Sequence, residues 1–297
     1  PPGQINRERN VILEEMAMYY DDPDDSLQDE FDAVVFADHP MGMNILGRQE
    51  TVGSFKRKNF QEFIKQHLDT HKVIFSSVGN VPMEKIVTLA EKYLGHVPSL
   101  TSRTKRKKFS GFKPKEVLLK RPVKQARCAM GRPAFHSTHA LRTPFFMLTN
   151  ILGGSGMNSR LNLALREKYG FVYSIGAQYV PFTDTGLFVI SFGTEPSQLK
   201  KSTELVKNEL RKLKENKLGI KQLTSSKEQI LGQIAMAEEN NVGFMMMMAR
   251  NLLDLNRITP LEEIFDRVKS TTSVELQQLA NEMFDENKLS TLMMIPK

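Results

Sequence analysis

The segment that decides the fold covers residues 151–174 and reads Ile-Leu-Gly-Gly-Ser-Gly-Met-Asn-Ser-Arg-Leu-Asn-Leu-Ala-Leu-Arg-Glu-Lys-Tyr-Gly-Phe-Val-Tyr-Ser. A glycine-rich loop is followed by residues 159–168, which predict a helix that Gly170 ends. The apolar and aromatic residues that follow predict a strand. Arg166 falls on the last helical turn and Tyr173 on the strand, so the turn at Gly170 can bring these two side chains to one point.

The surrounding residues predict an α+β domain. Short apolar or alternating runs predict strands, and longer runs with apolar residues every three or four positions predict helices. The predicted strands are 116–120, 126–131, 171–180, 186–193 and about 289–295, and the predicted helices are 141–152, 159–168 and three or four more after residue 193. Strand pairs followed by helices favour an antiparallel-rich sheet with helices packed on one face.

The first hundred residues give a different pattern. A single strand leaves its backbone without partners, and a stable sheet needs several strands. The chain also opens with Pro1-Pro2-Gly3 and no initiator Met, directly before a helix for which Asn6 is a plausible cap. We therefore expect an incomplete first domain, as in an N-terminally truncated protein. Its predicted elements are helices at roughly 6–22, 26–37, 57–69 and 82–94 and one strand, Lys72–Gly79.

A basic run separates the two regions. Residues 103–108 read Arg-Thr-Lys-Arg-Lys-Lys, and they hold much of the net charge of +7. We interpret residues 103–115 as a solvated linker between the C-terminal part of one domain, 1–102, and a second domain, 116–297. No zinc-finger spacing and no aromatic RNA-binding signature accompanies the run, so nucleic acid is not an expected partner.

Two glutamates near the start of the chain, Glu8 and Glu15, are candidates for a metal site. They lie two helical turns apart in a predicted helix and so project from one side, which also carries apolar residues. A carboxylate on an apolar face is costly unless a cation or hydrogen-bond donors meet it. The spacing alone is compatible with a bound metal, with a buried basic partner and with a salt-bridged surface helix.

Several segments resemble the pitrilysin/insulinase family of zinc peptidases. The resemblance implies that Glu15 is the third zinc ligand and that Glu8 supports the zinc site and orients the other ligands. It also implies that Arg166 and Tyr173 bind the substrate backbone or the polarised carbonyl, beside a developing oxyanion. The similar segments are residues 151–174, Glu8–Glu15, Asp22-Pro23, Asp38–Gly42, Ile45–Gly47 and Ser77–Val81.

The resemblance implies a zinc metalloendopeptidase that hydrolyses peptides or unfolded polypeptides held between two domains. In that family the first two zinc ligands and the general base come from an inverted zincin motif, H-x-x-E-H, upstream of the third ligand. None of the six histidines stands in such a motif, and the nearest approach, His67-Leu68-Asp69-Thr70-His71, has no glutamate between its histidines to activate water. We therefore expect zinc in the full-length protein, and neither bound zinc nor hydrolysis in this chain alone.

Two other functions are open. The same fold serves non-catalytic partner subunits, which keep the glycine loop and the Arg/Tyr pair but lose zinc ligands, and structural core proteins of the respiratory chain. The presence of Glu8 and Glu15 argues against the partner subunit. A homodimer or a paired subunit is compatible with the sequence, and Arg166 and Tyr173 could serve this chain's zinc site or a partner's.

The remaining features limit the other classes of protein. No stretch approaches the ~20 apolar residues of a membrane span, so we expect a soluble protein, cytoplasmic or periplasmic, with the compartment left open. The single cysteine, Cys128, excludes an internal disulfide. The Gly153–Gly156 loop lacks the Walker ending and is interpreted as a flexible connector. Met245–Met248 cover all sides of a predicted helix and are interpreted as core filler or, alternatively, as a domain or subunit contact.

Overall fold

The computed structural model describes residues 2–101 and 106–297. Short 3-10 turns occur at Pro40–Gly42, Thr70–Lys72, Pro196–Gln198 and Glu286–Lys288, and a π-helical turn, η3, at Asn162–Glu167. The helices and strands, in chain order, are α1 (Pro2–Asp21), α2 (Pro23–Val35), α3 (Gln49–Ser54), α4 (Arg57–His67), α5 (Met83–Leu94), β1 (Glu116–Arg121), β2 (Ala126–Ala134), α6 (Arg142–Gly153), β3 (Val172–Pro181), β4 (Gly186–Thr194), α7 (Leu199–Glu215), α8 (Ile220–Glu238), α9 (Asn241–Leu255), α10 (Leu261–Ser270), α11 (Ser273–Met283) and β5 (Ser290–Pro296).

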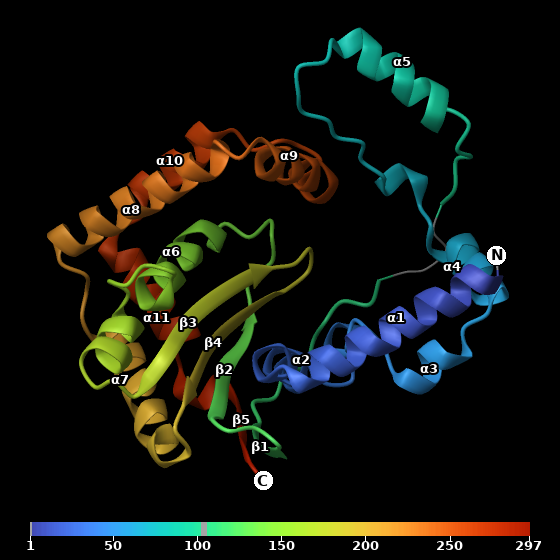
Figure 1. The fold of residues 1–297 in the computed structure, drawn as a ribbon. Coiled ribbons are helices and arrows are strands. Elements are labelled where there is room, and N and C mark those ends of the chain that lie inside the picture. Colours follow the sequence, from blue (N-terminus) through green and yellow to red (C-terminus); the bar gives the residue numbers. More distant parts are fainter. Residues whose placement is uncertain (1, 102–105) are drawn as a thin grey trace.

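The described residues form a five-stranded sheet in the order β1-β5-β2-β4-β3 (Figure 1). β1 runs parallel to β5, and the other pairings are antiparallel. α6, α7 and α11 cover one face of the sheet, where Phe145, Leu210 and Leu279 share a buried cluster with Phe188 and Ile190 of β4. This arrangement confirms the predicted α+β fold, in which the sheet is rich in antiparallel pairs and the domain's own helices pack on one face.

α2 covers the opposite face of the sheet, although it comes from the first part of the chain (Figure 1). The Asp22 side chain caps this helix by accepting hydrogen bonds from two backbone N–H groups of its first turn, and Pro23 stands at its start. Ion pairs join Asp24 to Arg127 at 2.7 Å and Glu30 to Arg121. The region predicted as a first domain therefore supplies one layer of the second. The buried contact consists of Leu27, Phe31, Val35 and Phe36 against Ala129, Leu187, Val189, Leu292 and Met294.

The described part of the basic run lies along the same layer. Arg106 pairs with Asp184 at 2.7 Å, and the ring of Phe109 contacts that of Phe36 with centroids 5.0 Å apart. The segment therefore contacts the folded domain at Arg106 and Phe109, whereas a solvated linker was predicted to make no such contacts. Residues 102–105 of the predicted linker lie outside the described residues, and the division of the chain at 103–115 stays a prediction.

The first hundred residues follow the predicted helices but not the predicted strand. α1, α2, α4 and α5 lie where helices were expected, whereas α3 was not predicted. The strand predicted at Lys72–Gly79 is wrong, because that segment continues as an exposed loop. Val73 and Phe75 are 60% and 58% exposed, and no described strand lies beside them to take their backbone hydrogen bonds. Asn6 does not cap α1, which begins at Pro2.

The four consecutive methionines lie in α9 and are not core filler. No residue of this helix is buried, and Met246 is 54% exposed. α9 packs beside α8, and the carbonyl oxygen of Met245 accepts a hydrogen bond from the Ser76 hydroxyl at 3.4 Å. The helix thus lies at the periphery of its layer, where one of its residues contacts the first part of the chain.

The glycine loop after α6 is held at both ends, whereas Ser155 and Met157 within it are exposed, and its role as a flexible connector stays a prediction. Gly153 is buried, and a Cβ atom there would lie 2.7 Å from the backbone nitrogen of Ala177 on β3. The Asn158 side chain donates a hydrogen bond to Gln229 of α8 at 3.0 Å. Glycine lets α6 approach β3 this closely, and Gly153 therefore helps to position the strand that carries Tyr173.

Gly153→Ala is expected to lower the free energy of unfolding by about 1–3 kcal/mol, because the added methyl group overpacks this contact. Gly232 of α8 is the matched control, since nothing lies within 4 Å of its Cβ position. Alanine at Gly232 is expected to raise stability by roughly 0.5–1 kcal/mol through helix propensity. Urea denaturation measures both changes, and a neutral Gly153→Ala variant would contradict the close approach of α6 to β3.

Candidate functional site

Glu8 and Glu15 both project from α1 into solvent. The continuous helix places residues seven positions apart on one side. Both glutamates are exposed, and so are Val11 and Met18, at 46% and 64%. Within the described part of the chain, no hydrogen bond or ion pair engages either carboxylate, so these residues do not form the salt-bridged surface helix that the spacing also allowed.

A groove of about 730 Å³ lies beside Glu8, between α1 and the α3–α4 region. Its walls are mainly apolar, with Ile12 from α1 and Phe60 from α4. Arg9 closes one side, where its guanidinium donates a hydrogen bond to the carbonyl oxygen of Phe55 at 2.5 Å. Glu8 therefore stands at the edge of an apolar depression, whereas Glu15 lies outside its lining.

The described residues do not assemble a metal site. No group of three or more His, Cys, Asp or Glu side chains within residues 2–101 and 106–297 is arranged to hold a metal ion. A catalytic zinc normally takes three protein ligands, so Glu15 cannot hold one alone, and its role as a ligand stays a prediction. His71 hydrogen-bonds Ser99 at 3.3 Å, and the His67 ring packs on Phe63 with centroids 4.6 Å apart.

Arg166 lies on the π-helical turn η3. The backbone N–H of Lys168 donates to the carbonyl oxygen of Leu163 at 3.1 Å, which is one residue longer than the α-helical spacing. Turns of this kind are frequent at functional sites. Gly170, with φ of 63°, then ends the turn, and its N–H donates to the carbonyl oxygen of Arg166 at 2.9 Å. A helical segment was thus predicted in the right place, but its π geometry was not.

Tyr173 lies in a β-bulge at the start of β3. Val172 pairs with Thr194 and Ile175 with Phe192, so the register shifts across Tyr173 and the residue after it. A bulge bends its strand and re-aims a side chain, and bulges are common next to active sites. Tyr173 is accordingly 84% exposed, whereas Val172 and Ile175 on either side are buried.

The two irregular elements bring Arg166 and Tyr173 together. The guanidinium carbon of Arg166 lies 6.0 Å from the centroid of the Tyr173 ring, at the outer range of cation–π contacts. Arg166 also stands 3.8 Å from the Glu167 carboxylate, and its side chain is 43% exposed. A cavity of about 310 Å³ adjoins the bulge, between α2 and the strands, where Ser174 and Gly176 line it. The pair can donate hydrogen bonds to an oxygen atom of a ligand bound at this surface.

The acidic pair and the Arg/Tyr pair are not brought together by the described residues. α1 contacts α2 and α3, whereas η3 contacts β3 and α7. α1 and β3 lie apart in Figure 1, with α2 between them. The convergence of Arg166 and Tyr173 followed from the glycine turn in the sequence, but nothing in the apolar periodicity indicated the bulge or the π-helical turn.

Comparison with known proteins identifies the family. Residues 54–230 match the family described as the peptidase M16 inactive domain, which is more than half of the chain. The chain belongs to this family. The result confirms the resemblance to zinc peptidases, and the matched region includes Arg166 and Tyr173 but neither Glu8 nor Glu15.

Relatives over nearly the whole chain carry zinc protease names. A Bacillus subtilis protein named uncharacterized zinc protease YmxG is 28% identical over 285 residues, which are 96% of this chain and 69% of the relative. An uncharacterized zinc protease of Rickettsia felis is 29% identical over 297 residues, covering 97% of this chain and 69% of the relative. The chain therefore contains the inactive domain of a zinc protease-like protein, and the H-x-x-E-H motif is not expected in that domain.

Solved structures support the same fold. The peptidase M16 inactive domain from Pseudomonas fluorescens superposes with a TM-score of 0.91 at 17% identity, covering 100% of this chain and 71% of that one. A chain of complex III from Candida albicans gives a TM-score of 0.85 at 14% identity, covering 97% and 70%. At these identities the similarity concerns the fold alone.

No helix among the described residues has the length and apolar character needed to cross a bilayer.

Proposed function

We propose that this chain is the C-terminal portion of a zinc metalloendopeptidase that cleaves peptides or unfolded polypeptides held between two domains. The observation that carries the proposal is the exposed Arg166–Tyr173 pair, built on a π-helical turn and a β-bulge. Each irregularity interrupts the regular backbone hydrogen bonds of its element. Each also carries a side chain that presents a hydrogen-bond donor to solvent. A requirement for function explains this better than a requirement for stability.

The Arg/Tyr pair binds the substrate in this proposal. The guanidinium of Arg166 offers charged donors and the phenol of Tyr173 offers one more. Donors placed where negative charge develops on a carbonyl oxygen stabilise the transition state more than the ground state. The cavity beside the bulge, lined by Ser174 and Gly176, gives room for a substrate side chain.

The acidic pair on α1 serves the metal in this proposal. Glu15 would be one zinc ligand, and Glu8, two turns away on the same side, would orient the site without binding the metal. Zinc, when bound, acts as a Lewis acid and lowers the pKa of water. The exposure of both carboxylates supports these roles, since a ligand must be open to the metal and to the elements that supply the remaining ligands.

The alternatives are a non-catalytic partner subunit and a structural core protein of the same fold. Zinc analysis and cleavage of a quenched fluorescent peptide by the full-length protein separate them. A peptidase binds about one zinc per chain and cleaves the peptide, whereas the other two classes do neither. A partner subunit would confer activity when mixed with its catalytic subunit, which also decides whether Arg166 and Tyr173 act in cis or in trans.

The chain by itself is expected to bind no zinc with the affinity of a catalytic site and to cleave no peptide, because one carboxylate does not replace three protein ligands. Metal analysis after dialysis against zinc-containing buffer and then against metal-free buffer measures this. Close to one zinc retained per chain would contradict the assignment of Glu15 as a ligand that needs partners from elsewhere.

A further inference from the structure

A cavity of about 710 Å³ lies in the second half of the chain and includes none of the residues assigned to zinc or substrate. Its walls are the loop between β2 and α6, the first turn of α6, the end of α9 and one side of α10. Leu255 and Ile264 supply apolar surface. Three arginines line it as well, and the partners of these arginines determine what the cavity can bind.

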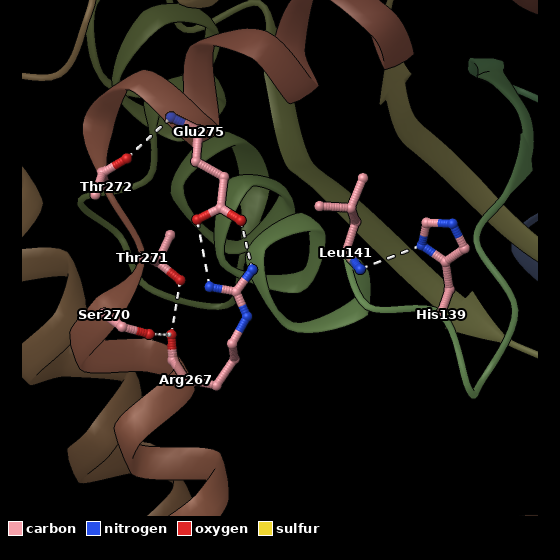
Figure 2. A network of polar contacts seen from close by, with 7 residues as sticks. All are labelled: His139, Leu141, Arg267, Ser270, Thr271, Thr272 and Glu275. Atoms are coloured by element: carbon pink, nitrogen blue, oxygen red, sulfur yellow. Dashed lines mark hydrogen bonds and ion pairs between the residues drawn. The ribbon is translucent and has the colours of Figure 1, made fainter.

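Two of the three arginines are neutralised by carboxylates. Arg257 makes two hydrogen bonds to Glu263, at 2.9 and 2.7 Å, and this contact lowers the pKa of the Glu263 carboxyl. Arg267 makes a similar two-point contact with Glu275 (Figure 2). Paired charges of this kind hold α10 to its neighbours and leave less net charge to attract a further anion.

The third arginine, Arg142, forms no ion pair with a carboxylate among the described residues, although its charge reaches the Glu263 carboxyl and helps to lower the pKa of that group. It lies in the first turn of α6, half-buried, and its Nη1 donates to the carbonyl oxygen of Ser137 at 2.6 Å. No side chain caps the N-terminus of this 12-residue helix. The unpaired guanidinium and the positive end of the helix dipole therefore favour an anion at the same wall. Asp266, the one further carboxylate on the wall, is exposed to water.

His139 adds a possible hydrogen-bond donor to that wall. Its Nδ1 accepts a hydrogen bond from the backbone N–H of Leu141 at 3.2 Å (Figure 2), so in the neutral ring Nε2 carries the proton. The ring stacks on Phe135 with centroids 4.5 Å apart, which fixes its orientation. No described residue accepts a hydrogen bond from Nε2.

Two buried hydroxyl groups on the walls have no partner among residues 2–101 and 106–297. Ser137 and Thr259 are 8% and 7% exposed, and neither hydroxyl oxygen hydrogen-bonds a described residue. A buried hydroxyl without a partner destabilises the fold, and a native structure rarely keeps two in one place without a use. A ligand oxygen at this wall would give both groups a partner.

We propose that this cavity binds the carboxylate of a ligand with an apolar body, such as a branched organic acid or the C-terminus of an apolar peptide. The carboxylate accepts hydrogen bonds from Arg142, His139 and the two hydroxyls, and the apolar body packs on Leu255 and Ile264. A single unpaired arginine suits one negative charge better than a phosphate dianion. The site is independent of zinc. A failure to bind carboxylates would therefore leave the peptidase proposal untouched, and a failure of the peptidase proposal would leave this one untouched.

The test titrates the full chain, observed by NMR or calorimetry, with four probes: isovalerate, isovaleramide, acetyl-Leu-Leu and acetyl-Leu-Leu amide. Both acids are expected to bind, and both amides to bind at least about tenfold more weakly, because each lacks the charge that Arg142 meets. Isovalerate binding as tightly as acetyl-Leu-Leu assigns a small acid, and tighter binding of acetyl-Leu-Leu assigns a peptide terminus. Equal binding of acids and amides, or binding of neither acid at millimolar concentration, overturns the proposal.

Three variants locate the site. Arg142→Gln should weaken acid binding about tenfold or more, and Arg250→Gln, at an exposed position of α9 outside the cavity, should leave it unchanged. Arg142→Gln also removes the hydrogen bond to the Ser137 carbonyl oxygen, so it could change the local structure. Thr259→Val is therefore needed as a second variant on the cavity wall. It removes an unpartnered hydroxyl, so it should raise the melting temperature of the free chain and still weaken acid binding. Unchanged binding in both Arg142→Gln and Thr259→Val overturns the assignment of this wall.

Discussion

Glu15→Gln in the full-length protein is expected to remove bound zinc and peptide cleavage together. An amide oxygen is a far weaker zinc ligand than a carboxylate, and zinc sites draw their protein ligands from His, Cys, Asp and Glu. Glu15 is exposed in this structure and makes no described contact, so the substitution should leave the melting temperature of the metal-free protein unchanged. Metal analysis and a peptide cleavage assay on the same preparation measure the two losses.

Glu8→Gln is the matched control, because it makes the same chemical change on the same side of α1. A group that only orients the ligands typically contributes about 10–100-fold to metal affinity or activity, so this variant should retain measurable zinc at high zinc concentration. If Glu8→Gln lost zinc as completely as Glu15→Gln, both glutamates would be ligands and the division of roles between them would be wrong.

The second half of the fold could be predicted closely because its signals are local. The predicted strands at 116–120 and 186–193 differ from β1 and β4 by a single residue at one end. These segments alternate or run apolar between clear turn residues, and that pattern determines strand type and face without knowledge of the neighbours. The helix predicted at 141–152 matches α6 to within one residue at each end.

The packing of α2 could not be predicted, because it depends on contacts across the chain. Its sequence shows an amphipathic helix, but not that the apolar side, with Phe31 fully buried, meets the sheet residues Val189 and Leu292. The same limit explains the wrong strand at Lys72–Gly79. A β-prone run forms a strand only where another strand offers backbone partners, and composition does not report whether one is present.

The candidate site was predictable in its residues and not in its geometry. Gly170 marked a tight turn, which is why Arg166 and Tyr173 were expected to converge. The π-helical turn and the bulge each insert an extra residue into the regular helical or strand repeat. The pattern of apolar residues does not indicate where such an insertion occurs.

Tyr173→Phe in the full-length protein is expected to lower the kcat of peptide cleavage by about 100–1,000-fold, the usual loss for one donor to a developing oxyanion. The variant keeps the ring that faces the Arg166 guanidinium at 6.0 Å and removes only the hydroxyl group. Since Tyr173 is 84% exposed, the melting temperature and the zinc content should both stay the same. Steady-state kinetics, thermal unfolding and metal analysis on one preparation separate these effects.

Tyr169→Phe is the matched control for this experiment. Tyr169 lies four residues earlier, is 45% exposed and stacks on Phe171, so it samples the same turn without belonging to the Arg/Tyr pair. Its loss of a hydroxyl should leave kcat within about twofold, as for surface changes away from a site. An unchanged kcat in Tyr173→Phe, or an equal loss in both variants, would remove the catalytic role from Tyr173. The π-helical turn and the bulge would then need a structural reason, because irregular backbone persists only where the surrounding structure enforces it.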